Sequence, residues 1–300
     1  MDIAGLVQGA SQGEGLGNRF LAHIREVGII AHVVRCFDSP DIVHVSGRID
    51  PESDIDTINT ELALADLETL ARHRERAERA LRVQGKAEQK AAEAVLGALD
   101  AIGPALEDGR PVRSVPLGSE EEALVRDCHF ITAKPQLYVC NVDEEGIKAG
   151  GGSAYVQAVQ KKAAAEGSAA VAICGKFEAE LIAIDPAERM AFLEELGLAE
   201  SGLSVLVRAA YGLLGLRTFF TIKSDECRAW TIQAGDKAPR AARAIHTDFE
   251  KGFIKAEVYA CDDIFHYGTE AKIKEAGKYR VEGKEYVVQD GDIIFFKFNV

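Results

Sequence analysis

The stretch Asp2-Ile3-Ala4-Gly5-Leu6-Val7 runs directly into a glycine-rich segment, Gly9-Ala10-Ser11-Gln12-Gly13-Glu14-Gly15-Leu16-Gly17. An Asp-x-x-Gly that heads a flexible segment and precedes a helix is what a phosphate- and magnesium-sensing site needs. The carboxylate can hold a metal-bound water, and a glycine amide can approach a terminal phosphate because no side chain stands in the way. Short patterns of this kind also arise by chance, so the meaning of the stretch depends on the rest of the chain.

Length and composition indicate a globular protein of two or three domains. The chain has 300 residues, of which 47% are hydrophobic, enough to bury a substantial core. The chain contains no run of roughly eighteen apolar residues, which would be needed to span a membrane, and its first residues show no secretory signal. We therefore expect a cytoplasmic protein without a membrane partner. The six cysteines include no Cys-x-x-Cys pair, which predicts reduced, mostly buried thiols rather than a zinc site.

The net charge of −13 argues against a general nucleic-acid binder, but the charge is unevenly placed. Residues 217–300 contain 14 Lys and Arg against 14 Asp and Glu, so residues 1–216 hold 21 against 34 and carry the whole −13. The C-terminal part is therefore the surface that repels RNA less.

Three apolar runs predict parallel strands of an α/β sheet that is buried on both faces. They are Ile29–Phe37, Gln136–Cys140 and Ala169–Ile173, and helical patterns lie between and after them. The polar loop Asp38–Ser53, which carries His44, comes after the first run. Ligands bind at the carboxyl ends of the strands in such sheets, so this loop is a candidate for a site.

From Asp54 onward the pattern is helical, and a second helix, Ala87–Glu107, returns before Gly109-Arg110-Pro111. We therefore predict a helical hairpin inserted into the α/β domain. Residues 71–90 contain seven basic and three acidic side chains. This basic face fits either a solvated helix surface or an arm that reaches toward RNA.

Asn141 comes directly after the second predicted strand, where an Asn can bridge loops and donate a hydrogen bond to a purine N7. P-loop GTPases carry Asn-Lys-x-Asp at this place, and their Asp accepts hydrogen bonds from guanine N1 and N2. This chain has Val142 for the Lys and Glu144 for the Asp, which weakens selection of guanine. After the third strand, Cys174-Gly175-Lys176 offers small residues whose backbone could meet the base.

The C-terminal residues predict a small β-grasp sheet with no sign of catalysis. The expected order is two strands, a helix, a third strand and two further strands within Glu285–Phe298. The first four elements are Arg217–Ile222, Arg228–Ile232, Ala238–His246 and Ile254–Tyr259. We expect this C-terminal sheet to provide a surface that binds RNA or protein.

Three motifs together resemble the YchF family, whose members are related to the Obg GTPases: Asp2–Ser11, Asn141-x-x-Glu144 and Ile245-His246-Thr247-Asp248-Phe249-Glu250-Lys251-Gly252-Phe253. The resemblance covers the whole chain. It implies a P-loop NTPase-like G domain at 1–66 and 128–216, an inserted coiled-coil hairpin at 67–127 and a C-terminal TGS domain at 217–300. It also implies a ribosome-associated, Mg²⁺-dependent ATPase and weaker GTPase, monomeric, which contacts RNA and the large ribosomal subunit through the hairpin and the TGS domain.

One departure from the family is large. The family begins with a strand and a Gly-x-x-x-x-Gly-Lys-Ser/Thr phosphate loop, and this sequence contains no such motif. We therefore expect an N-terminally truncated, incomplete G domain that hydrolyses little ATP as it stands. A ribosome- or RNA-binding protein that does not hydrolyse nucleotide stays open as the alternative.

The same resemblance implies the roles of individual residues. Asp2 is the expected magnesium ligand, and the Gly5 amide is expected at the γ-phosphate. Leu6 stands where Ras-like enzymes carry a water-orienting Gln, so His44 is the candidate to position the attacking water, with an ordinary loop histidine as the alternative. The residues expected around the base are Asn141, Val142, Glu144, Cys174 and Gly175.

Overall fold

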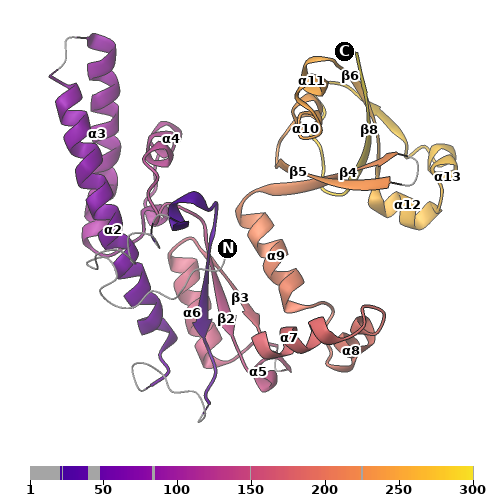
Figure 1. The fold of residues 1–300 in the computed structure, drawn as a ribbon, viewed down its shortest axis with the longest axis horizontal. Coiled ribbons are helices and arrows are strands. Elements are labelled where there is room, and N and C mark those ends of the chain that lie inside the picture. Colours follow the sequence, from indigo (N-terminus) through magenta and orange to yellow (C-terminus); the bar gives the residue numbers. More distant parts are fainter. Residues whose placement is uncertain are drawn as a thin grey trace. The chain divides into compact units, whose positions relative to one another are not determined.

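A computed structural model describes residues 21, 23–39, 48–82, 85–148, 150–223 and 226–299. The chain forms two compact units, one ending at Ala210 and the other beginning at Tyr211 (Figure 1). Each unit has its own sheet and its own core, and we describe them separately.

The first unit is built on a parallel sheet with strand order β1-β2-β3, formed by β1 (Ile30–Arg35), β2 (Gln136–Asn141) and β3 (Ala169–Ile173). The three apolar runs of the sequence are therefore confirmed as strands. The expectation of burial on both faces holds for β2, whose residues 136–140 are all buried. It is wrong for β1, where Val33 is 64% exposed. In the described part of the sheet, β1 and β3 are the outer strands.

Helix α6 (Ala154–Ala165) packs on β2 and β3 and closes the core of this unit. Its Val156 and Val159 meet Tyr138 and Cys140 of β2 in one apolar cluster. Four of the six thiols, Cys36, Cys128, Cys140 and Cys174, are buried and free, as the sequence predicted. The other helices of this part are α5 (Glu144–Lys148), α7 (Gly175–Ala183), α8 (Arg189–Glu195) and α9 (Gly202–Leu213), of which α5 and α7 were not predicted.

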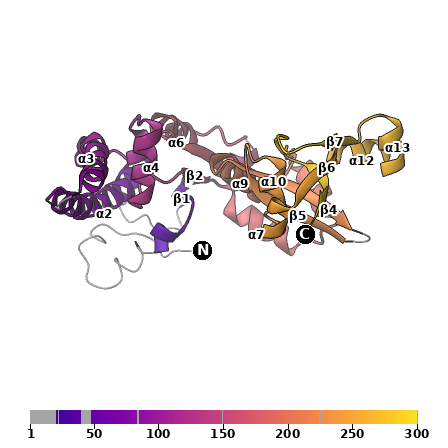
Figure 2. The ribbon, with the colours of Figure 1, turned by 90° about the horizontal axis from the view of Figure 1, so that it is seen from above.

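Two long helices, α2 (Pro51–Ala80) and α3 (Lys86–Glu107), lie side by side as the predicted hairpin (Figures 1 and 2). Helix α2 begins three residues before the predicted start. The Asp50 side chain caps it by accepting a hydrogen bond from Ser53 N at 3.2 Å, and Pro51 occupies its first turn. The chain then passes through the short turn η2 (Val112–Ser114) to α4 (Ser119–Asp127), which packs on α3.

A buried carboxylate ties α2 to the segment that leads into β2. Asp66, which is fully buried, accepts hydrogen bonds from Ile131 N at 2.8 Å and from Thr132 N and Thr132 Oγ1, each at 2.7 Å. Burial raises the pKa of this carboxyl, although the three donors pull that pKa down. Because all three donors are removed from water, these hydrogen bonds fix the middle of α2 against the segment that leads into β2.

The second unit is a five-stranded sheet with strand order β5-β4-β8-β6-β7. Strand β4 runs parallel to β8, and the other paired strands are antiparallel. Its strands are β4 (Leu216–Lys223), β5 (Glu226–Gln233), β6 (Phe253–Ala260), β7 (Arg280–Glu282) and β8 (Asp292–Phe298). Its helices are α10 (Ala238–Ala242), α11 (Thr247–Lys251), α12 (Cys261–Tyr267) and α13 (Glu270–Glu275).

Two expectations for this unit were wrong. The segment Glu285–Phe298 holds one strand, β8, rather than two, because the buried Asp292 carboxylate folds the preceding residues into a turn by accepting from Tyr286 Oη at 2.6 Å and Gln289 N at 2.9 Å. Only the isolated Lys237–Val287 bridge remains of the other strand. The helix predicted at Ala238–His246 ends at Ala242, and β7, α11, α12 and α13 were not predicted.

Replacing Asp66 with Ala is expected to lower the free energy of unfolding of the first unit by about 3 kcal/mol, because three buried donors lose their acceptor. Urea unfolding followed by far-ultraviolet circular dichroism measures this loss. Fluorescence of Trp230, the single tryptophan, reports on unfolding of the second unit, and the urea midpoint of that transition should not change. Asp66→Asn keeps one acceptor oxygen and should lose less; an Ala variant as stable as the parent would contradict the role of Asp66.

Candidate functional site

The carboxyl ends of β2 and β3 bring two of the predicted base-binding residues into contact. Asn141 is the last residue of β2, and Gly175 is the first residue of α7, two positions after β3. The Gly175 N–H donates to Asn141 Oδ1 at 3.0 Å. Asn141 therefore joins the two loops, as its place after the strand indicated. A Cβ at position 175 would lie 3.3 Å from Asn141 Oδ1, so glycine suits this close approach.

The hydrogen bond from Gly175 also fixes the orientation of the Asn141 amide. Since a backbone N–H is a donor, the side-chain atom that faces it must be the oxygen. Asn141 Nδ2 then points away from Gly175, and no described residue accepts a hydrogen bond from it. A purine N7 is an acceptor in both adenine and guanine, so this amide can recognise a purine without distinguishing between the two.

An ion pair lies beside this amide. Glu144, the first residue of α5, accepts from Lys176 Nζ at 2.7 Å, and Lys176 is the second residue of α7. The hydrogen bond from Lys176 lowers the pKa of Glu144, and the same bond raises the pKa of Lys176. The two side chains are 46% and 72% exposed, which leaves both within reach of a ligand.

Two other predicted base-binding residues turn their side chains into the protein. Val142 and Cys174 are each 2% exposed and belong to the core cluster under the sheet ends. Val142 N donates to Ile173 O at 2.9 Å, and Cys174 O accepts from Glu178 N at 3.0 Å. These residues support the two loops, and their side chains face the core instead of the surface that carries Asn141 and Glu144.

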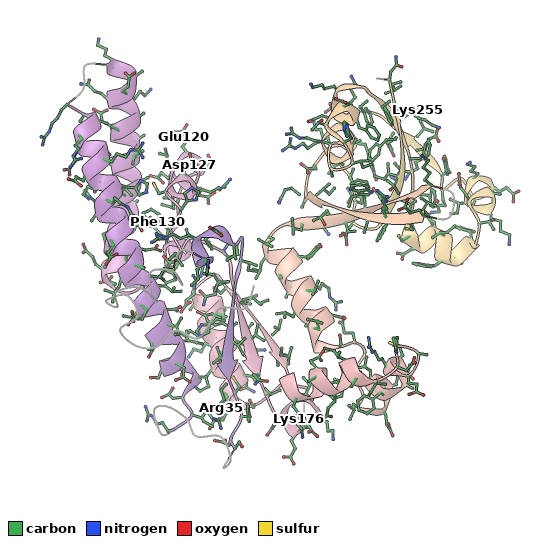
Figure 3. The ribbon with its side chains drawn as sticks, in the orientation of Figure 1. Arg35, Glu120, Asp127, Phe130, Lys176 and Lys255 are labelled. Atoms are coloured by element: carbon green, nitrogen blue, oxygen red, sulfur yellow. The ribbon has the colours of Figure 1, made fainter. Side chains whose placement is uncertain are left out.

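The end of β1 adds residues that the sequence reasoning did not identify. Arg35 is paired in register with Asn141, and its guanidinium lies 4.9 Å from the centre of the Phe37 ring while Nε donates to Phe37 O at 3.1 Å. Tyr155 Oη donates to Asp38 at 3.2 Å. Figure 3 shows Arg35 and Lys176 at the same end of the sheet. Arg35 and Phe37 lie at the end of the predicted strand Ile29–Phe37, and Asp38 opens the loop named as a candidate from the sequence. Tyr155 lies in α6, and its contact with Asp38 had no signal in the sequence.

Three predicted residues, Asp2, Gly5 and His44, lie outside the described residues. Within the residues that the structure describes, no group of three His, Cys, Asp or Glu side chains is arranged to hold a metal ion. A search of the same residues found no helix with the length and apolar character needed to cross a bilayer.

Comparisons with known proteins agree with this architecture. The family model YchF-GTPase_C, described as a protein of unknown function, matches residues 216–299. Proteins named "Ribosome-binding ATPase YchF" from Haemophilus influenzae and Bacillus subtilis are each 50% identical to this chain, over all of it and 81% of their own length. The structure titled "Structure of the Schizosaccharomyces pombe YchF GTPase" superposes with a TM-score of 0.82 at 36% identity, covering 98% of this chain and 78% of that one. The resemblance found in the sequence motifs is thereby confirmed, and the chain belongs to the YchF family.

Proposed function

We propose that this protein is a YchF-type ATPase and weaker GTPase that hydrolyses ATP to ADP and phosphate as a switch for ribosome binding. The observation that carries the proposal is the surface at the ends of β2 and β3, where Asn141 is oriented by Gly175 and flanked by Glu144. It occurs in a chain half identical to proteins named for ATP hydrolysis and ribosome binding.

The domain assignment is part of this proposal. We assign residues 1–66 and 128–216 to a G domain, 67–127 to a coiled-coil hairpin and 217–300 to a TGS domain. The parallel sheet, the α2–α3 pair and the separate five-stranded sheet support it. We further propose a cytoplasmic monomer that contacts RNA of the large ribosomal subunit.

The catalytic roles rest on the sequence pattern. We propose Asp2 as the Mg²⁺ ligand, the Gly5 amide as a donor to the γ-phosphate and His44 as the group that orients water. When bound, Mg²⁺ would neutralise phosphate charge.

In this chain extended at its N-terminus with the phosphate-loop segment of a relative, ATP is expected to bind more tightly than GTP, because Glu144 replaces the Asp that reads guanine while Asn141 serves both purines. Titration of ribose-labelled ATP and GTP, followed by fluorescence, measures both dissociation constants. Asn141→Ala should weaken both nucleotides to a similar degree. Tighter binding of GTP by the extended parent chain would contradict the assignment.

His44→Ala is expected to slow ATP hydrolysis by roughly one to two orders of magnitude with little change in nucleotide affinity, as for loss of a water-positioning group. The measurement is phosphate release by this chain extended at its N-terminus with the phosphate-loop segment of a relative. His23→Ala is the control, and equal turnover of His44→Ala and parent would remove His44 from the site. Ribosome binding without turnover in the extended chain would favour the non-hydrolysing alternative.

Arg72, Arg76 and Arg79 are exposed at helical spacing on α2. Their reversal to Glu is expected to weaken cosedimentation with ribosomes, and binding by the parent should fall steeply with added salt, because phosphate contacts release counterions. Reversal of three exposed basic residues of the first unit outside the hairpin, Lys148, Lys161 and Arg208, makes the same change in net charge as a control. Equal losses in both triple variants, or binding that is insensitive to salt, would count against a specific contact through the hairpin.

A further inference from the structure

We propose that Lys176 is a specificity-determining residue, which favours adenine over guanine by occupying one oxygen of the Glu144 carboxylate. The inference rests on the proposed function, since it concerns how the same site distinguishes two purine nucleotides. Lys176 acts through Glu144 and is therefore a positioning residue.

In this geometry, one oxygen of the Glu144 carboxylate is already bonded to the ammonium group of Lys176. Lys176 Nζ lies 2.7 Å from Glu144 Oε1, and Oε2 has no hydrogen-bond donor among the described residues. The pair bridges the loops that come after β2 and β3, and Asn141 Oδ1 and Gly175 N bridge the same two loops at 3.0 Å. The amide that can hold N7 and the carboxylate that can read the rest of the base are thus fixed to the same pair of segments.

The number of donors on each base decides which purine this arrangement fits. Guanine presents N1–H and N2–H side by side, and a carboxylate accepts this pair best with one oxygen for each donor. Adenine presents a single donor group, its N6 amine, and its N1 is an acceptor. A carboxylate with one oxygen held by an ammonium group can still accept from N6, and the ammonium has further N–H bonds to offer an acceptor. With guanine bound, the same ammonium group would face N1–H and N2–H with its own N–H donors, which is unfavourable.

The pair is expected to matter only when a base is bound. Both side chains are exposed in the free protein, where such pairs contribute little to stability. A bound base displaces water from the pair, and the attraction between the two charges is stronger in a less polar medium. The other charged groups that influence the pair are Lys148 for Glu144 and Glu180 for Lys176. Neither of them is recorded in a hydrogen bond or ion pair with Glu144 or Lys176.

The test is the ratio of the dissociation constants for GTP and ATP in the 300-residue chain, measured by titration of ribose-labelled nucleotides. Lys176→Ala should lower this ratio by about three- to tenfold, mainly through tighter GTP binding, with thermal unfolding unchanged. Lys176→Arg keeps a cation and should retain most of the parent ratio. In a Glu144→Gln background, Lys176→Ala should change the ratio by less than about twofold, because the group it acts through is gone.

The outcomes separate this inference from the proposed function. If the parent binds both nucleotides and Lys176→Ala leaves the ratio unchanged, the role of Lys176 is wrong and the proposed function stands. An equal effect of Lys176→Ala in the parent and in the Glu144→Gln background would also overturn it, because Lys176 would then act without the Glu144 carboxylate. If the parent binds neither nucleotide, the same titrations are made on this chain extended at its N-terminus with the phosphate-loop segment of a relative. Failure of the extended chain to bind either nucleotide overturns the proposed function, and the inference that rests on it.

Discussion

The first unit depends on one buried carboxylate, that of Glu166 at the end of α6. It accepts hydrogen bonds from Tyr138 Oη of β2 at 2.6 Å, from Arg113 of η2 at 3.0 Å and from Asn59 of α2 at 3.2 Å. Glu166 is only 12% exposed and Arg113 only 7%. Burial lowers the pKa of Arg113, and the nearby Glu166 charge opposes that shift. Loss of the Glu166 charge would leave Arg113 buried and without its carboxylate partner, which typically costs about 3–5 kcal/mol. Loss of Arg113 would still leave Glu166 paired with Lys162 Nζ at 3.5 Å.

The hydrogen bonds of Glu166 hold α2, the first helix of the hairpin, in a fixed position against β2 of the sheet. Asn59 and Asp66 lie two turns apart on α2, and both are held by groups outside the helix. Between them, Leu62 and Ala65 pack into an apolar cluster with Ile131. The lower half of α2 is therefore a rigid root, and its upper half, which carries the exposed arginines, is supported mainly by α3. A helix anchored in this way can place charged side chains at a fixed distance from the sheet, since an α-helix rises about 1.5 Å per residue.

The sequence predicted the elements whose apolar pattern is long and regular. The three parallel strands and the two hairpin helices were found because burial demands a period that the residues display. The root of the hairpin was not, because Asn59 and Asp66 are polar residues in core positions, and their partners lie 79 and 65 residues away. The short helices α12 and α13 offer too few turns for a periodic signal. Residues 285–288 include the strand formers Tyr286, Val287 and Val288, yet only Val287 pairs, in an isolated bridge to Lys237, while the Tyr286 hydroxyl donates to Asp292.

In the candidate site, too, one feature could be predicted from the sequence and another could not. The position of Asn141 after a strand was enough to predict a bridge between loops. The partner of Glu144 was not predicted, because Lys176 lies 32 residues further along the chain, beyond α6 and β3, and only the β2–β3 register brings the two loops together. A carboxylate read from sequence alone is a free acceptor with two oxygens. The fold converts it into an acceptor with one oxygen committed to an ammonium group.

Charge also has to be judged locally. A net charge of −13 argues against binding to RNA, but charges on a protein surface are screened within about 8–10 Å at physiological salt. The exposed arginines of α2 and the acidic first turn of α4, with Glu120, Glu121 and Glu122, therefore act as separate surfaces although both belong to the first unit. Figure 3 shows Glu120 and Asp127 on α4, beside the hairpin. A polyanion that approached the hairpin would be attracted on the arginine face and repelled near α4, so the acidic residues of α4 would restrict its orientation.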